Sequence, residues 1–304
     1  MNHDNAGAAR ATRSRPSTRC FRSIRALTAR VRAGALFGLG GLALCPAALA
    51  QEAMYTAAAT MPSPGVSVVR QQFHYFRLGA SESEGFERAE KFEIKNTIQY
   101  GLVQDLSVTL DAPFEVAKVK PVNVDASETS AQLDVLDLTF KYRIYQDDSG
   151  GIDTTRIALL AGNRFRLAGR FSSDPHAGIV FTQVLGRHGF NAEAHYTFNT
   201  GSDSGAPNFG GKGEADALNL NLAYVLRISP VEFTPESQSA WYITAEINQI
   251  YELNGDYEAR FSPGLMYEGR RWGFEVMAQI PVYSHLNSRG RQQLALGLGW
   301  RFIF

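Results

Sequence analysis

Apolar and polar residues alternate along most of the chain after residue 65. In the last segment, leucine and aromatic residues occupy the even positions 294–304, and small or polar residues occupy the odd positions 293–301. Residues 218–228 repeat this pattern. A period of two is typical of a β-strand with one apolar and one polar face. No run after Gln51 has the pattern of a long amphipathic helix.

Twelve segments of this kind predict twelve strands. They are 66–78, 92–100, 106–111, 136–144, 155–166, 177–185, 190–199, 218–228, 240–251, 258–268, 272–280 and 293–304. Most approach the ~9–11 residues that a tilted strand needs to cross a bilayer, which exceeds the ~5–6 residues usual in soluble sheets. Inside lipid every backbone amide must be paired, so such a sheet has to close on itself. The sequence therefore predicts an all-β, transmembrane, antiparallel up-and-down β-barrel of about 12 strands over 66–304, with ten and fourteen strands as alternatives.

The predicted connections support this fold. The outer loops fall near 80–90, 117–131, 167–175, 200–216, 253–257 and 284–291, and the inner turns near 103–105, 146–153, 186–189, 229–239 and 269–271. Most outer loops are longer than the inner turns, as in bacterial barrels. Aromatic residues lie near predicted strand ends, where the two membrane interfaces favour them. We expect the loop at 200–216 to be solvated, because it lacks the acidic spacing of a calcium loop.

The first fifty residues differ from the rest. Residues 1–32 contain eight arginines and a single acid, an apolar run follows over 33–47, and Ala48-Leu49-Ala50 precedes Gln51. These are the parts of a secretory signal peptide, so we expect cleavage after Ala50. This interpretation is favoured over a membrane anchor, a lipoprotein acceptor at Cys45 and a mitochondrial transit peptide. Residues 51–65 would then form a periplasmic tail or a segment that enters the lumen.

Charge and cysteine content narrow the function further. Without residues 1–50 the chain keeps 22 of its 30 basic and 29 of its 30 acidic residues, a net charge of −7. A net negative surface disfavours nucleic acid as a partner. Both cysteines, Cys20 and Cys45, lie in the segment expected to be removed. We therefore expect no disulfide and no thiolate metal site, and predict no metal and no cofactor.

The polar face of each predicted strand should point into the barrel. The lumen-lining candidates are Glu93, Lys95, Asp111, Asp137, Lys141, Arg143, Arg156, Glu193, His195, Arg227, Glu246, Glu275 and Arg301. One interpretation is a pore lining whose mixed charges set solute selectivity. The other is a mesh of ion pairs that fills a narrow lumen. The sequence favours neither.

The histidines raise a hydrolase hypothesis. His195 and Thr197 lie two residues apart on one strand face, whereas His176, His188 and His285 fall in predicted loops or turns. A catalytic pair acting on bilayer lipid should face outward, and His195 is expected to face the lumen. No catalytic residue is assigned, and we do not predict an enzyme.

The end of the chain carries a family resemblance. Trp300, Phe302 and Phe304 form an alternating aromatic ending that resembles the C-terminal signature recognised by the outer-membrane assembly machinery, which the resemblance implies as a partner. Tyr100-Gly101-Leu102-Val103-Gln104-Asp105-Leu106-Ser107-Val108 resembles the second-turn segment of the outer-membrane family called "MetA-pathway of phenol degradation". Pro263-Gly264-Leu265, Trp272 and Ile280-Pro281-Val282 resemble its later strands.

This similarity covers roughly residues 60–304, and Gly162-Asn163-Arg164-Phe165 stands where the family would have Pro-Thr-Gly. It implies a transporter-like role near the catabolism of aromatic compounds. The sequence as a whole predicts a bacterial outer-membrane barrel, surrounded by lipid, that passes small solutes, including aromatic or hydrophobic compounds. The alternatives are a barrel-embedded lipid hydrolase and a structural or adhesive barrel.

Overall fold

The computed structural model describes residues 52–133, 135–150, 153–167, 171–201, 208–234 and 236–304. The predicted signal peptide lies outside the described residues. The strands are β1 (Ser67–Leu78), β2 (Phe86–Val103), β3 (Leu106–Pro121), β4 (Glu128–Leu133), β5 (Val135–Gly150), β6 (Asp153–Arg166), β7 (Ser172–Leu185), β8 (His188–Thr197), β9 (Ala217–Ser229), β10 (Ser239–Glu252), β11 (Tyr257–Gly269), β12 (Trp272–His285) and β13 (Gln292–Ile303). Within the described part of the chain, no helix is long and apolar enough to span a membrane.

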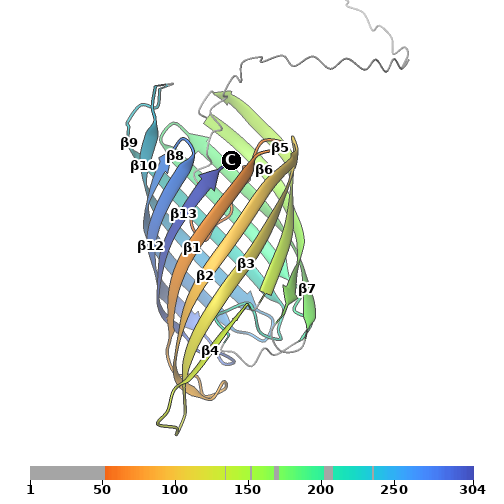
Figure 1. Cartoon of the computed structure of the whole chain (residues 1–304), viewed down its shortest axis with the longest axis vertical. Coiled ribbons are helices and arrows are strands. Elements are labelled where there is room, and N and C mark those ends of the chain that lie inside the picture. Colours follow the sequence, from red (N-terminus) through yellow and green to blue (C-terminus); the bar gives the residue numbers. More distant parts are fainter. Residues whose placement is uncertain (1–51, 134, 151–152, 168–170, 202–207, 235) are drawn as a thin grey trace, which may run out of the picture. The chain divides into compact units, whose positions relative to one another are not determined.

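Twelve of these strands close into an antiparallel barrel (Figure 1). Each pairs with its neighbour in sequence, β3 pairs with both β2 and β5, and β1 pairs with β13. At the closing seam Val68 lies opposite Ile303, and the backbone amide of Phe304 donates to the carbonyl of Ser67 over 2.9 Å. The predicted all-β barrel of twelve strands is confirmed. Closure pairs both edges of the sheet, as a lipid environment requires.

The apolar and polar faces of the strands also point in the predicted directions. On β9 the side chain of Leu222 is 51% exposed, whereas the next residue, Ala223, is 4% exposed. On β10 Ile247 is 42% exposed and Glu246 is fully buried. The apolar side chains therefore form the outer surface, and the polar side chains point into the lumen. An exposed leucine on this outer surface marks a position that would contact acyl chains.

Several strands run further than the alternation predicted. β3 continues to Pro121 and pairs over Phe114–Val119 with the extra strand β4, within the predicted loop 117–131. β5 and β6 likewise extend through most of the predicted turn 146–153. Toward the outer end, polar residues also take outward positions of β3, such as Lys118 and Lys120, so the apolar–polar alternation stops while backbone pairing continues. Those two loop predictions were therefore wrong in their bounds.

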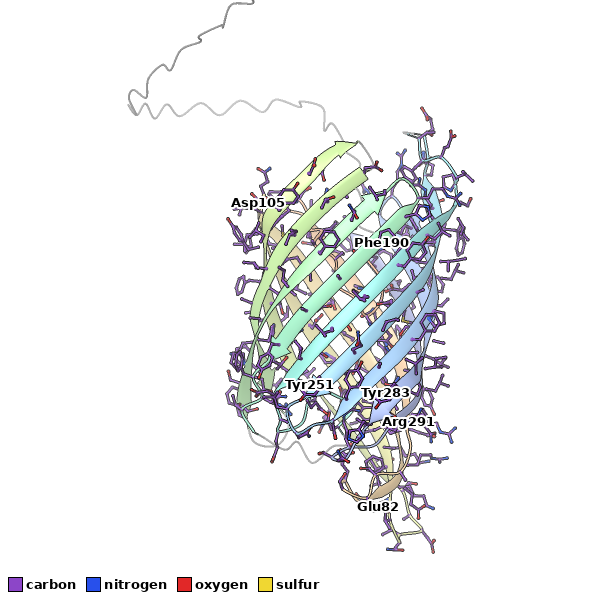
Figure 2. All side chains as sticks on the ribbon, turned by 180° about the vertical axis from the view of Figure 1, so that it is seen from behind. Glu82, Asp105, Phe190, Tyr251, Tyr283 and Arg291 are labelled. Atoms are coloured by element: carbon purple, nitrogen blue, oxygen red, sulfur yellow. The ribbon has the colours of Figure 1, made fainter. Side chains whose placement is uncertain are left out.

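Aromatic side chains gather at the ends of the strands. Trp241, Tyr267 and Trp272 from three adjacent strands form one cluster, with ring centroids 5.0 and 4.8 Å apart. Tyr257 and Tyr283 lie 5.7 Å apart near the opposite end. Figure 2 shows Tyr251 and Tyr283 at the end of the barrel away from Asp105. These positions suit rings that are half apolar and half solvated at a membrane interface.

Candidate functional site

The two ends of the barrel differ in their connections. The end that carries Phe304 has two-residue turns at 104–105, 186–187 and 270–271, with 230–238 as a longer exception. The other end has the connections 79–85, 198–216 and 286–291. Because bacterial barrels have short periplasmic turns and longer extracellular loops, we call the first the inner end and the second the outer end.

A short segment before β1 lies inside the barrel. We call residues 53–60 the lumen segment. Thr56, Ala58 and Ala59 are at most 1% exposed. The carboxylate of Glu246 accepts hydrogen bonds from the amide of Met54 (3.1 Å) and the hydroxyl of Thr56 (2.6 Å), which is 190 residues away in sequence. Of the two possibilities for residues 51–65, the structure places residues 53–60 in the lumen.

Other strands hold the same segment from the sides. Glu193 on β8 accepts from the amide of Ala57 (3.1 Å), and Thr182 on β7 accepts from the amide of Ala59 (2.8 Å). The ammonium of Lys141 on β5 donates to the carbonyl of Ala58 (2.7 Å) and to that of Thr60 (3.3 Å). Backbone groups removed from water need such partners. The lumen segment is therefore bound on several sides by polar groups of the wall.

Two glycines make room for this path. A Cβ at Gly297 would lie 2.4 Å from the sulfur of Met54. A Cβ at Gly101 would lie 2.2 Å from the carbonyl oxygen of Ser63, where the chain leaves the lumen. A side chain at position 101 would displace the backbone of Pro62 and Ser63, whereas one at position 297 would require the Met54 side chain to move.

We expect Lys141→Met to loosen the lumen segment while the barrel stays folded. Hydrogen bonds to a charged group stabilise by ~1.5–3 kcal/mol, so amide exchange in the peptide 53–60 should accelerate by about tenfold or more. Hydrogen–deuterium exchange with mass spectrometry measures this directly. Lys118→Met, at an exposed position of β3, is the matched control and should leave that peptide unchanged. Equal exchange in both variants would contradict the assigned role of Lys141.

A loop closes much of the outer end. We call residues 208–213, from the β8–β9 connection, the outer loop segment. Phe209 is 8% exposed and meets the ring of Phe76 edge-on, with centroids 5.8 Å apart. The ammonium of Lys91 lies 4.5 Å from the centre of the Phe209 ring. The prediction of a solvated loop at 200–216 was wrong for this part. Gly210 and Gly211 have φ of +105° and +69°, which lets the chain turn inward.

Buried ion pairs hold this end together. Arg289 pairs with Glu252 and with Glu258, each at 2.9 Å, and all three are nearly inaccessible to solvent. Glu252 also accepts from the amide of Gly211 (2.9 Å). Glu84, in the β1–β2 loop, accepts from the amides of Asn208 and Gly290. Burial raises the pKa of Glu84, and those two hydrogen bonds act in the opposite direction.

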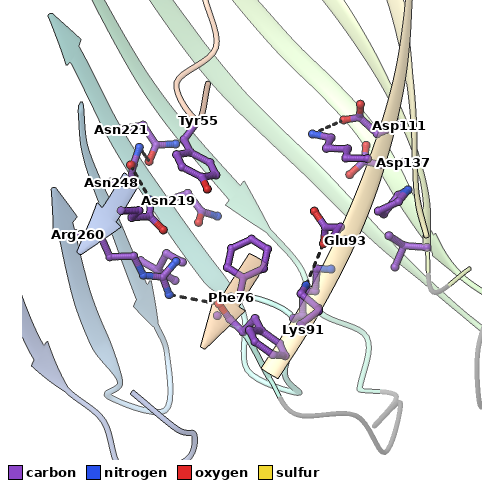
Figure 3. A pocket seen from close by; sticks show the side chains of 18 of the residues that line it. Tyr55, Phe76, Lys91, Glu93, Asp111, Asp137, Asn219, Asn221, Asn248 and Arg260 are labelled. Carbon is purple, nitrogen blue, oxygen red and sulfur yellow. Dashed lines mark hydrogen bonds and ion pairs between the residues drawn. The ribbon is translucent and has the colours of Figure 1, made fainter. Parts of the chain in front are cut away.

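A cavity of about 270 Å³ remains between the lumen segment and the outer loop segment. Figure 3 shows Tyr55 on one side of it and Phe76 on another. One wall carries carboxamides, including Asn219, Asn221 and Asn248, and the facing wall carries charged side chains. The cavity is thus bounded by two segments remote in sequence and by strands from most of the barrel.

The thirteen sequence candidates all belong to the inward-facing side of their strands, but they divide into different roles. Glu93, Lys95, Asp111 and Asp137 line the cavity, while Lys141, Glu193 and Glu246 bind the lumen segment. The others interact with neighbours: Glu275 with Arg70, Arg301 with Glu268, Arg143 with Asp105, Arg156 with Asp148, Arg227 with the ring of Phe233, and His195 with His176. Many of the candidates thus form ion pairs or bind the lumen segment, as the second interpretation expects, and four of them line the cavity. The role of these charges in solute selectivity stays a prediction.

Several residues at the cavity were not among the candidates. Lys91, Arg164 and Arg260 occupy inward-facing positions of their strands. Applying the period-two rule to every residue of these strands would have included them. Phe76 gave no such signal, because an apolar side chain on an inward face breaks the pattern, and Phe209 lies in the β8–β9 connection, outside any strand. Tyr55 lies before the first strand, where no period exists.

The histidines are placed differently from the sequence expectation. His176 lies within β7 rather than in a loop, because that strand begins at Ser172. Its ring contacts that of His195 in the lumen, with centroids 4.8 Å apart. Thr197 makes no side-chain hydrogen bond, so it is not paired with His195. Among the described residues, no three His, Cys, Asp or Glu side chains converge as metal ligands.

Comparison with known proteins supports the fold. No protein-family model and no curated protein matches the sequence. The crystal structure of the COG4313 outer membrane channel from Pseudomonas putida F1 is similar, with a TM-score of 0.52 and 10% identity over 82% of this chain and 98% of that one. The β domain of the Bordetella autotransporter Brka has a TM-score of 0.47 and 10% identity over 79% of this chain and 100% of that one. The NanC porin has a TM-score of 0.44 and 9% identity over 78% of this chain and 98% of that one.

At such low identity the similarity concerns the fold alone. The resemblance to the MetA-pathway family stays a prediction, as do the assembly signal and the proposed partners. The closed twelve-stranded barrel with an apolar outer surface is the fold by which proteins cross the bacterial outer membrane, and it places the protein there.

Proposed function

We propose that the protein is an outer-membrane channel for small solutes, narrowed from its two ends by the lumen segment and the outer loop segment. The observation that carries this proposal is the cavity of about 270 Å³ left between them inside a polar lumen. Barrels of eight strands are just filled by their side chains, and wider ones leave interior space. The narrow passage favours small solutes over polymers.

The solute class predicted from the family resemblance was aromatic or hydrophobic. Tyr55, Phe76 and Phe209 give the cavity an aromatic surface that supports such a solute. The walls, however, carry mostly charged and carboxamide side chains, which a purely apolar solute could not satisfy. The aromatic class is therefore retained as a proposal to be compared with a polar one.

Liposome swelling with the refolded, full barrel tests the proposal. We expect proteoliposomes to swell with solutes of one sugar ring and much less with trisaccharides. Protein-free liposomes and liposomes with a heat-denatured sample are the controls. Planar-bilayer recording should show discrete conductance steps of small amplitude. Neither flux nor conductance above these controls would refute the channel function.

A further inference from the structure

We propose that the cavity between the lumen segment and the outer loop segment binds a neutral, polyhydroxylated ring compound of about one monosaccharide. The inference deepens the proposed function, because it names the solute class of the same cavity. It rests on three features of the cavity: the pairing of its charges, the row of carboxamides along one wall, and its aromatic surfaces.

Each charged side chain at the cavity already has a partner of opposite charge, although Glu115 and Glu258, the partners of Lys212 and Arg260, lie outside the cavity lining. The pairs are Lys91–Glu93 (2.9 Å), Lys95–Asp111 (3.0 Å), Arg164–Asp137 (3.5 Å), Lys212–Glu115 (2.9 Å) and Arg260–Glu258 (2.5 Å). A charged solute would lose its hydration and would have to displace a carboxylate or a cation from its partner, which is costly in a confined site. A neutral solute carries no such cost. The cavity therefore disfavours both anions and cations.

The opposite wall offers neutral hydrogen-bonding groups. Gln279 on β12 donates to Asn248 on β10 (3.0 Å), and Asn248 donates to Asn221 on β9 (3.3 Å). Asn221 donates in turn to Glu193 (3.1 Å), which holds the lumen segment. These carboxamides are thus oriented by their neighbours before any solute enters, and such preorganisation favours binding.

Asn219 differs from the rest of this row. Its carboxamide lines the cavity, yet within the described part of the chain it makes no hydrogen bond. A carboxamide carries two donor hydrogens and one acceptor oxygen. A solute hydroxyl can both donate and accept a hydrogen bond, so it can pair with either the NH₂ group or the oxygen of a carboxamide. Figure 3 shows Asn219 directed toward the space between Tyr55 and Phe76.

Aromatic rings complete the match to a sugar-like ring. Tyr55 from the lumen segment, Phe76 from β1 and Phe209 from the outer loop segment border the same space. Lys91 lies over the rings of Phe76 and Phe209, and His74 stacks on Phe76, so these two rings offer mainly their edges. The partly exposed Tyr55 can cover the C–H side of a ring whose hydroxyls reach the carboxamides. The volume of about 270 Å³ is just below the ~300–1,000 Å³ of sites for drug-sized ligands. One ring therefore fits better than two.

Isothermal titration calorimetry on the refolded barrel tests this inference. The detergent should have an amine-oxide headgroup, because sugar headgroups would compete. We expect glucose to bind, and glucuronate and glucosamine, which have the same ring with a charge, to bind at least about tenfold more weakly. Phenol is the aromatic arm of the comparison. Binding of phenol without glucose, or binding of either charged sugar as tight as that of glucose, would overturn the inference.

A variant pair locates the binding. Asn219→Leu keeps the size of the side chain and removes its polar groups, so glucose affinity should fall about tenfold, equivalent to 1.4 kcal/mol. Asn96→Leu is the control, since Asn96 lies on the lipid-facing side of β2, and glucose affinity should not change. An equal affinity in the two variants would exclude Asn219 and this cavity.

The two proposals can fail separately. Glucose that binds but produces no swelling of proteoliposomes would refute the channel function and leave the binding site standing. Swelling with small solutes, but no calorimetric binding of glucose, would support the channel and overturn the inference about solute class.

Discussion

Removing residues 53–60 should raise the single-channel conductance of the barrel several-fold. These residues occupy the lumen and are held there by Glu246, Glu193 and Lys141. Without them, water and ions should fill the space, because the polar side chains that now bind the segment can be hydrated instead. A barrel of twelve strands is wider than one that its own side chains fill. Planar-bilayer recording on wild type and deletion variant gives the ratio.

A point substitution separates this effect from a change in barrel assembly. Glu246→Ala removes the carboxylate that accepts from Met54 and Thr56, and it should raise the frequency of large-conductance openings. Glu232→Ala, at an exposed position of the inner turn 230–238, is the matched control and should behave as wild type. If the deletion left conductance unchanged, another element, such as the outer loop segment, would have to limit the passage.

Replacing Leu222 by arginine should destabilise the barrel by about 2–4 kcal/mol, the cost of an arginine on the lipid face near the bilayer midplane. Leu222 lies in the middle of β9, is 51% exposed, and neighbours the outward side chains of Ala192 and Ile247. The arginine would have to leave water or thin the bilayer locally. Urea-dependent folding into lipid vesicles measures the free energy of unfolding.

The control uses the same strand at a different depth. Leu218 lies between Tyr196 and Tyr251, at the level of the interfacial aromatic residues. Leu218→Arg should cost only ~0–1 kcal/mol, because the penalty falls toward the interface. If the two arginine substitutions lowered the free energy of unfolding equally, the cost of a charge on the outer face of β9 would not depend on depth in the bilayer. The assignment of its apolar side chains to the bilayer would then be wrong.

The period-two pattern was sufficient to predict the barrel fold. Positions such as Leu222 and Ile247 could be assigned to the outer face because every outward residue at that depth meets the same hydrocarbon. One rule then applies to each strand separately, and no knowledge of its neighbours is needed. The period-two rule failed beyond the hydrocarbon region, where outward residues no longer have to be apolar. For that reason the extensions of β3 and β5 and the short strand β4 were not predicted.

The interior depended on tertiary structure. The alternation of polar residues correctly indicated that Glu246, Glu193 and Lys141 face inward. It gave no sign that all three bind the same partner, the segment 53–60. These contacts join residues up to 192 positions apart, and they exist only because closure brings distant strands around the same space. The inward turn of Phe209 is a second example.

The sequence by itself determined which side of each strand faces outward, since lipid selects apolar side chains at every outward position alike, and it indicated about twelve strands. Only the closed barrel decided what occupies the lumen, which charges pair there and where a cavity remains. The physical reason is that an inward side chain meets particular groups from other strands, whereas an outward one meets a uniform solvent.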